Sequence, residues 1–145
     1  ETDGIATWSR SLAAGEEAGL VGSKYYTDYP IVPLKNMAFL INMDLMANGQ
    51  DGMTLVNGSI FTRQFNRLVS LNDSAHYLKV IDKRGKAADS DHYWFSEKGV
   101  KAFFFYLLGK YPYYHDIYDT ADKPTLAGYD GAFRLISDFI RSYGQ

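Results

Sequence analysis

Residues 36–46 read NMAFLINMDLM, a nearly continuous apolar run that contains a single aspartate. A run this short and this apolar predicts a strand that is buried on both faces of a sheet. Residues 100–108, VKAFFFYLL, form a second run of the same kind. Apolar residues recur at helical spacing between and after the two runs, so predicted strands alternate with predicted helices. This alternation favours a layered α/β fold.

The other predicted elements follow from helical periodicity and from the positions of glycine and proline. Helices are expected over residues 5–12, after a turn at residues 15–22, from a Ser59 cap through residue 71, and over residues 126–143. A short strand is expected at residues 78–81, with loops at residues 48–57, 84–90 and 111–125. The last helix carries one apolar stripe, made of Leu126, Tyr129, Phe133, Ile136 and Ile140.

The composition indicates one folded domain over residues 1–145. Of the 145 residues, 46% are hydrophobic and 16% are aromatic, which is enough to build a core. The formal net charge of −2 predicts neither nucleic acid nor an anionic membrane as a partner, and no apolar run is long enough to span a membrane. Cysteine is absent, so any metal would be bound by histidine, aspartate or glutamate.

Two adjacent glutamates, Glu16 and Glu17, stand in front of a glycine-rich turn. Neighbouring side chains point well apart on a helix and to opposite faces at the end of a strand, so the two carboxylates should face different surroundings. Taken alone, the pair could simply stabilise a helix N-terminus through the helix dipole. Asp44 lies inside an apolar run and needs a partner, which is either a buried hydrogen bond or a metal ion.

Further polar candidates flank the second apolar run. Asp91 and His92 lie in a predicted loop before it, and His115 lies in the loop after it. Functional groups gather at the carboxyl ends of strands in open α/β sheets, so these loops are expected to converge. Each histidine could otherwise be an ordinary hydrogen-bonded loop residue beside an aspartate. Asp3 could likewise be a helix cap.

Four motifs occur in order along the chain: GEEAGLVGSKYY at 15–26, NMDLM at 42–46, SDHYWF at 90–95 and YHDIYDTADK at 114–123. Their order and spacing resemble those of the co-catalytic zinc aminopeptidase family, which includes carboxypeptidase-like and glutaminyl cyclase relatives. The resemblance covers nearly the whole chain. It implies a three-layer α/β/α sandwich with a mixed, mostly parallel central sheet.

The resemblance also implies a role for each matched residue. Glu16 corresponds to the general base of the family and Glu17 to a zinc ligand. His115 would share the first zinc ion with Glu17, Asp44 would bind the second, and Asp3 would bridge the two. Water between two zinc ions is acidified, and a glutamate beside it that binds no metal can accept its proton.

The remaining matched positions would support this site. Asp91 and His92 are expected near it, as supporting or substrate-positioning groups rather than ligands, and Asp119 is expected to brace the His115 loop. The tyrosines that could line the cleft, without an assigned role, are Tyr93, Tyr113 and Tyr114.

The chain departs from the family pattern in two ways. The histidine of an upstream HxD motif is not present, so the sequence supplies at most four of five ligands. Only residues 4–15 separate Asp3 from the glutamate pair, where the family has a helix and a buried strand. The chain also lacks an initiator methionine and opens on polar residues. We therefore expect it to be the C-terminal portion of a longer enzyme.

The function that the resemblance implies is zinc-dependent hydrolysis of N-terminal peptide bonds by an aminopeptidase, with two zinc ions and a peptide substrate. A glutaminyl cyclase-like acyltransferase is one alternative, although Ser90 before Asp91 favours the peptidases. A metal-free, non-catalytic binding domain of the same fold is the other. By the habit of the family, the expected location is the periplasm or the cell exterior. No feature of the sequence predicts an oligomeric state.

Overall fold

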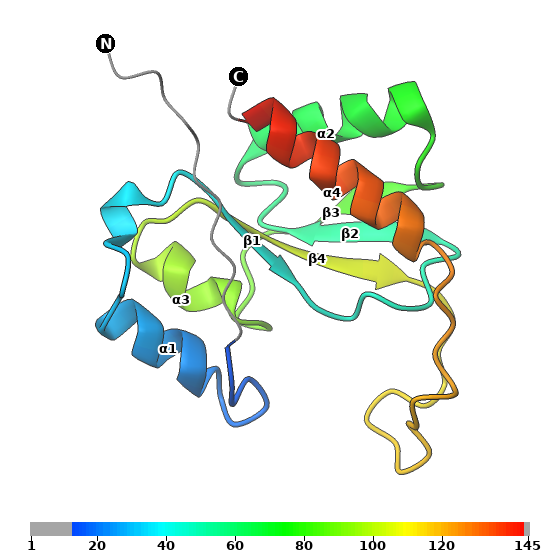
Figure 1. Cartoon of the computed structure of the whole chain (residues 1–145), viewed down its shortest axis with the longest axis horizontal. Helices are drawn as coiled ribbons and strands as arrows, with labels where there is room; N and C mark the ends of the chain where they lie inside the picture. The colour runs from blue at the N-terminus through cyan, green and yellow to red at the C-terminus, as the bar shows by residue number, and fades with distance from the viewer. Residues whose placement is uncertain (1–12, 144–145) are drawn as a thin grey trace.

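The computed structural model describes residues 13–143 (Figure 1). The expected helix at residues 5–12 and the candidate ligand Asp3 lie outside the described residues. The elements, in chain order, are α1 (Val21–Asp28), a short 3-10 helix (Leu34–Asn36), β1 (Leu40–Met43), β2 (Gly52–Val56), α2 (Thr62–Ala75), β3 (Ile81–Lys83), α3 (His92–Glu97), β4 (Ala102–Leu108) and α4 (Tyr129–Tyr143).

The described strands form one sheet in the order β1-β4-β2-β3. β1 runs parallel to β4, with Leu40 opposite Ala102, and β2 runs parallel to β3. The central pair is antiparallel and places Leu55 of β2 opposite Phe105 of β4. Two of the three pairings are parallel, which confirms the prediction of a mixed, mostly parallel sheet.

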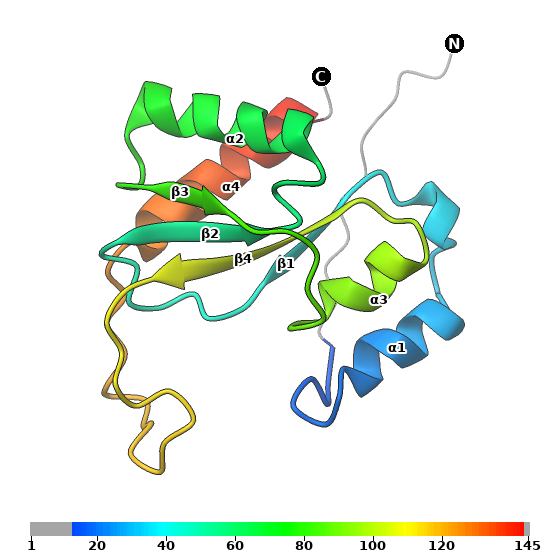
Figure 2. The same cartoon turned by 180° about the vertical axis from the view of Figure 1, so that it is seen from behind.

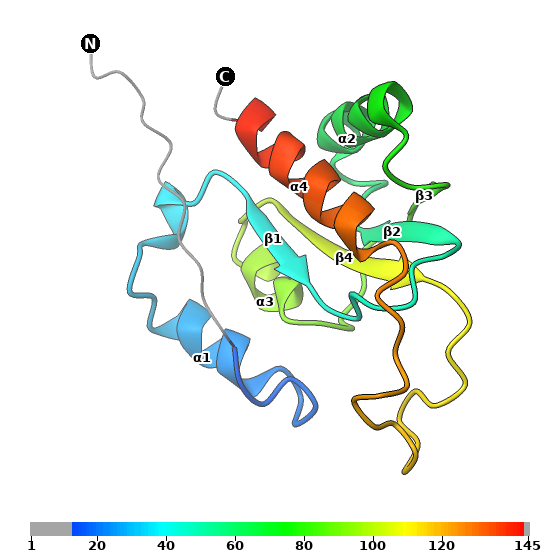
Figure 3. The same cartoon turned by 45° about the vertical axis from the view of Figure 1, so that its right-hand side comes forward.

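Helices cover both faces of this sheet. α2 and α4 lie together on one face, whereas α1 and α3 lie on the other (Figures 1 and 2). The view in Figure 3 shows α4 crossing in front of the sheet. The three-layer α/β/α arrangement is therefore as expected from the sequence.

The main hydrophobic core lies between the sheet and the α2–α4 layer. Alternate residues of the central strands point into it, including Phe103 and Phe105 of β4 and Leu55 of β2, which are fully buried. Phe139 of α4 packs against Phe103 with ring centroids 6.3 Å apart. Full burial of one such side chain contributes about 1.5–3 kcal/mol, so the aromatic run of β4 is a main source of stability.

The prediction of a loop over residues 48–57 is wrong, because β2 occupies Gly52–Val56 in the middle of the sheet. The flanking glycines concealed a strand of only five residues. Gly52 has a φ of +129°, and a Cβ there would collide with the Val80 carbonyl at the adjoining end of β3. Glycine therefore permits close strand pairing here, although in the sequence it resembles a loop signal.

The first apolar run also differs from its prediction. Only Leu40–Met43 is a strand, and among the described strands it lies at the edge of the sheet with partly exposed residues rather than buried on both faces. The short strand expected at residues 78–81 lies at Ile81–Lys83 instead.

Two helices also differ from their predictions, one in where it begins and the other in which residues it buries. The stretch with Asp91 and His92 is not wholly loop, because α3 begins at His92. On α4 the predicted stripe is largely outside the core, since Leu126, Tyr129 and Phe133 are exposed. The buried residues of this helix are Ala132, Leu135, Ile136 and Phe139. No helix in the described part of the chain is long and apolar enough to cross a membrane.

Candidate active site

The glutamate pair lies in a tight turn that leads into α1. The Glu16 carbonyl accepts hydrogen bonds from the N–H groups of Gly19 at 3.0 Å and Leu20 at 2.9 Å. Gly15 and Gly19 adopt φ values of +72° and +96°, which glycine tolerates without strain. Glu16 is half-buried, whereas the side chain of Glu17 is 78% exposed. The two carboxylates thus face different surroundings, as their adjacency predicted.

Close packing explains one more glycine of this motif. Gly22 lies in the first turn of α1, and a Cβ there would lie within 3.0 Å of the Ala14 carbonyl oxygen. Real Cβ atoms do not approach backbone so closely. Gly22 therefore lets α1 pack directly on the segment that carries the two glutamates, which fixes where the turn lies.

Asp44 follows the last residue of β1, and its backbone N–H donates to the Phe105 carbonyl of β4 at 3.2 Å. Its carboxylate accepts a hydrogen bond from the Leu45 N–H at 2.8 Å. The Ser90 hydroxyl donates to the other carboxylate oxygen at 3.3 Å, and the Asn42 amide donates to that hydroxyl at 2.7 Å. Asn42, Ser90 and Asp44 thus form a chain of hydrogen bonds that orients the carboxylate.

His115 lies in the long connection between β4 and α4. Its Nε2 atom is 3.9 Å from a carboxylate oxygen of Glu17, and both side chains are more than half exposed. The loop around His115 is held by its own hydrogen bonds, including one from the Tyr111 hydroxyl to the Asp119 carboxylate. The Tyr118 N–H donates to the Asp116 carboxylate at 2.9 Å. Asp119 thus joins the two ends of residues 111–119 through Tyr111, and its supporting role at the site stays a prediction.

Electrostatics indicates that these groups converge. The pKa of the Glu16 carboxyl is raised, first by burial and then by the negative charges of Glu17, Asp44 and Asp91, while His115 opposes the shift. Several segments that are distant in the sequence therefore place charge around one carboxyl. Asp44 and the loop that carries His115 follow the ends of β1 and β4, the edge at which α/β sheets bind ligands.

Tyr114 belongs to the same cluster. Burial raises the pKa of its phenol, and the carboxylates of Glu17, Asp44 and Glu16 raise it further. Its ring packs against the ring of His115, with centroids 4.1 Å apart. The sequence had placed Tyr114 near the cleft without a role, and the structure places it against the candidate metal ligand.

Backbone conformation marks the same region. Leu20, Leu45 and His115 adopt φ values of +59°, +54° and +57°. These values are uncommon for residues other than glycine and cost about 1–3 kcal/mol each unless surrounding contacts impose them. These three lie within a few residues of the glutamate pair or Asp44, or are themselves a candidate ligand, whereas the other three described non-glycine residues with positive φ, Asn48, Asn57 and His76, belong to other turns.

His92 is the first residue of α3 and not a loop residue. Its side chain is fully buried at the start of α3, 5.5 Å from the ring of Phe104 between centroids, and burial lowers its pKa. The neighbouring Asp91 contributes to the pKa of Glu16, and one of its carboxylate oxygens is buried without a hydrogen-bond partner among the described residues. The role of both residues near the site stays a prediction.

The donor types match a zinc site, because zinc accepts carboxylate oxygen and imidazole nitrogen. Among residues 13–143, however, no group of three or more histidines and carboxylates is close enough together to hold a metal ion. Glu17 and His115 lie near one another, and Asp44 is turned toward Ser90. Glu17, Asp44 and His115 thus have the donor atoms that zinc accepts, but the described residues do not bring the three together as one ligand group.

Sequence reasoning missed the hydrogen-bond chain that supports Asp44. Asn42 lies two residues before Asp44, a spacing that places both side chains on the same side of a strand. Ser90 directly precedes Asp91 in the SDH motif, but only the fold brings it to Asp44, 46 residues away in the sequence. The Asn-x-Asp spacing was the one local signal of this arrangement.

The sequence profile of peptidase family M28 matches residues 11–140. The chain belongs to peptidase family M28, and the resemblance carried by its four motifs is confirmed. Among curated proteins no match to the chain is found.

Solved structures show the same fold. BSAP, a zinc aminopeptidase from Bacillus subtilis, matches with a TM-score of 0.76 and 17% identity, over 91% of this chain and 34% of that one. The aminopeptidase from Aneurinibacillus sp. strain AM-1 matches with a TM-score of 0.70 and 22% identity, over 88% and 31%. Glutaminyl cyclase from Bacteroides thetaiotaomicron matches with a TM-score of 0.68 and 19% identity, over 90% and 48%. The chain thus spans a third to a half of the length of these proteins.

Proposed function

We propose that the complete protein is a zinc-dependent aminopeptidase that hydrolyses the N-terminal peptide bond of peptides. The observation that carries this proposal is the pairing of His115 with Glu17 at 3.9 Å, beside a Glu16 carboxyl whose pKa is raised by burial and by the charges of Glu17 and Asp44. Membership in peptidase family M28 and the likeness to two aminopeptidase folds support it.

Glu16 is the proposed general base. Burial and neighbouring negative charge raise the pKa of its carboxyl, and a carboxylate of raised pKa is a better proton acceptor near neutral pH. It would take a proton from the attacking water as the water oxygen bonds to the scissile carbonyl carbon. The same proton would then pass to the departing amine as the C–N bond breaks.

Glu17, Asp44 and His115 are the proposed zinc ligands of this chain. Bound zinc would acidify water and polarise the scissile carbonyl. The Ser90 and Asn42 hydrogen bonds would hold Asp44 in one orientation. Partners of this kind are a common requirement of metal-binding carboxylates.

The test uses the complete protein loaded with zinc and an aminoacyl-nitroanilide, which releases a coloured amine on hydrolysis. Glu16→Gln should lower kcat at least a hundredfold, because general-base catalysis contributes about 10²–10⁴-fold, and should leave the zinc content unchanged. Glu17→Gln should lower the zinc content itself.

Glu97→Gln provides the matched control, because Glu97 lies at the end of α3 and pairs with Lys86 on the surface. It should retain both zinc and turnover. Equal loss of zinc in Glu16→Gln and Glu17→Gln would contradict the division of roles. Absence of both zinc and turnover from the unchanged protein would refute the peptidase, and cyclisation of an N-terminal glutamine without hydrolysis would assign the cyclase chemistry instead.

A further inference from the structure

A groove of about 620 Å³ lies between the first half of α2 and the end of α4. Buried Phe139 and Lys101, which lies immediately before β4, contribute to its lining. Arg63 and Arg67 of α2 line it one helical turn apart. Gln64 and Ser142 add an amide and a hydroxyl. Its lining includes no aspartate or glutamate among the described residues.

The two arginines of this groove differ from the other arginines in the described part of the chain. Arg84, Arg134 and Arg141 each pair with an aspartate at 2.9–3.0 Å. Within residues 13–143, Arg63 and Arg67 have no carboxylate within ion-pair distance. The whole chain carries a net charge of −2, so this cluster of uncompensated positive charge runs against the overall balance.

Helix stability does not explain the placement of these arginines. Arg63 lies in the first turn of α2, which contains no acidic residue, and positive charge is disfavoured at this end of a helix. Arg63 and Arg67 are also like charges spaced i,i+4, a destabilising arrangement. The positive charge of the groove is therefore present although it destabilises α2.

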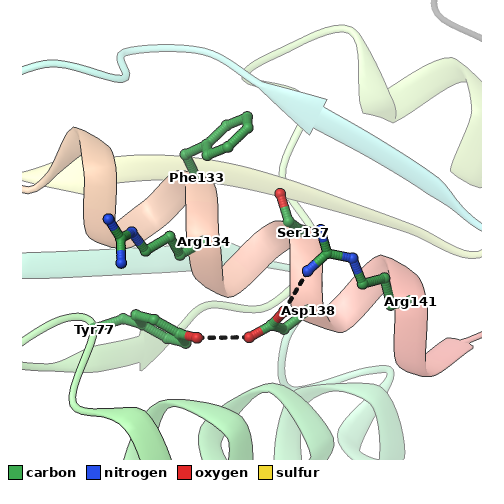
Figure 4. A pocket seen from close by; sticks show the side chains of 6 residues that line it. All are labelled: Tyr77, Phe133, Arg134, Ser137, Asp138 and Arg141. Carbon is green, nitrogen blue, oxygen red and sulfur yellow. Dashed lines mark hydrogen bonds and ion pairs between the residues drawn. The ribbon is translucent and has the colours of Figure 1, made fainter.

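In a smaller pocket along α4 the arginines are paired with aspartates. It has a volume of about 330 Å³ and also contains two arginines, Arg134 and Arg141. Figure 4 shows the Asp138 carboxylate between Tyr77 and Arg141, where it accepts hydrogen bonds from the Tyr77 hydroxyl at 2.6 Å and from the Arg141 guanidinium at 3.0 Å. Arg134 pairs with Asp130. Because both guanidinium groups already pair with a carboxylate, this pocket has little free positive charge with which to bind an anion.

The groove is also separate from the candidate active site. Lys101 immediately precedes β4, and α2 follows β2, which runs antiparallel to β4. The groove therefore lies at the edge where β4 begins, whereas Asp44 lies at the edge where the parallel strand β1 ends. The seven residues of β4 span about 20 Å between these edges, at roughly 3.3 Å per residue.

We propose that this groove binds a small phosphorylated molecule with at least two phosphate charges. The planar guanidinium group binds phosphate oxygens in pairs, and a lysine adds a point charge. The volume lies in the range of about 300–1,000 Å³ that is typical of small-molecule sites. The amide and hydroxyl groups of the lining can bind further phosphate oxygens or a polar substituent.

Inorganic pyrophosphate is the probe, and isothermal titration calorimetry on the full chain at low ionic strength is the measurement. The unchanged chain should bind pyrophosphate with one site, and the affinity should fall as salt is raised. The double variant Arg63→Gln, Arg67→Gln should weaken binding at least tenfold. Arg134→Gln, which removes an exposed arginine of the smaller pocket, should leave binding unchanged.

A second variant covers the case in which the double change disturbs α2. Lys101→Gln lies outside every helix and strand and should weaken binding at least threefold. Citrate, which carries carboxylates in place of phosphates, should bind more weakly than pyrophosphate. The proposal would be overturned by no binding of pyrophosphate at 10 mM, by equal binding to all variants, or by tighter binding of citrate.

Discussion

Replacement of Ser90 by alanine removes the hydroxyl that joins Asn42 to Asp44. Ser90 is 1% exposed, and its hydroxyl accepts from the Asn42 amide and donates to the Asp44 carboxylate. A hydrogen bond to a charged group contributes about 1.5–3 kcal/mol, and loss of a partner from a buried donor costs a similar amount. Asn42 and Asp44 are only half-buried, so water can replace part of what is lost.

We therefore expect Ser90→Ala to lower the free energy of unfolding by about 1–2 kcal/mol. For a chain of this length, the corresponding fall in Tm is about 3–6 °C. Denaturant unfolding followed by circular dichroism measures both. If Asp44 binds zinc in the complete protein, Ser90→Ala should also weaken zinc affinity. The expected loss is about tenfold to a hundredfold, which is typical when a group that hydrogen-bonds to a metal ligand is removed.

The matched control is Ser74→Ala, since Ser74 is an exposed serine of α2 that donates to the Ser70 carbonyl. It should change stability by less than about 0.5 kcal/mol. A double-mutant cycle of Asn42→Ala with Ser90→Ala should show coupling of at least about 0.5 kcal/mol. Equal effects of Ser90→Ala and Ser74→Ala on stability and zinc affinity, or strict additivity in the cycle, would refute the reasoning.

Three further predictions concern the same structure. The pKa of Glu16 is raised in the folded state, so ionisation of this carboxyl destabilises the fold as the pH rises above the ordinary value of 4.5. Glu16→Gln removes this ionisation and should therefore raise Tm at pH 7 and leave Tm unchanged at pH 4. Gly22→Ala should lower stability by about 1–3 kcal/mol, because the added methyl collides with backbone. Gly85→Ala, whose methyl would make only an ordinary contact with the Ser59 hydroxyl at 3.6 Å, should change stability little in the same denaturant assay. Burial and the hydrogen bond to Asp119 raise the pKa of Tyr111 to about 12, so Asp119→Asn should move the ultraviolet titration of this phenol toward 10, and an unchanged titration would contradict the assigned contact.

The sequence predicted well those elements whose pattern of apolar residues fits only one kind of secondary structure. The aromatic run of β4 is apolar on both faces, and it lies in the middle of the sheet. The apolar spacing in α2 predicted a helix that the structure places at Thr62–Ala75. The prediction that loops at the strand ends converge stays a prediction for the site as a whole, although His115 does lie 3.9 Å from Glu17.

The missed features depend on contacts between distant residues. β2 was missed because Gly52, which allows close approach of β3, has the same local signature as a loop glycine. The periodicity of α4 predicted a stripe through Phe133, whereas packing on the sheet buries Leu135 and Phe139 instead. The Ser90–Asp44 hydrogen bond joins two motifs that periodicity treats separately.

Asp44 directly follows β1, a strand that should unfold earlier than the central strands of the sheet. Among the described strands β1 pairs with β4 alone, and it is four residues long and partly exposed. Outer strands of this kind open with a smaller free energy than the central strands, which exchange their amide hydrogens only on global unfolding. Asp44, the proposed zinc ligand, thus directly follows a strand that opens early, so on warming its surroundings should come apart while the β2–β4 core and its helices remain folded.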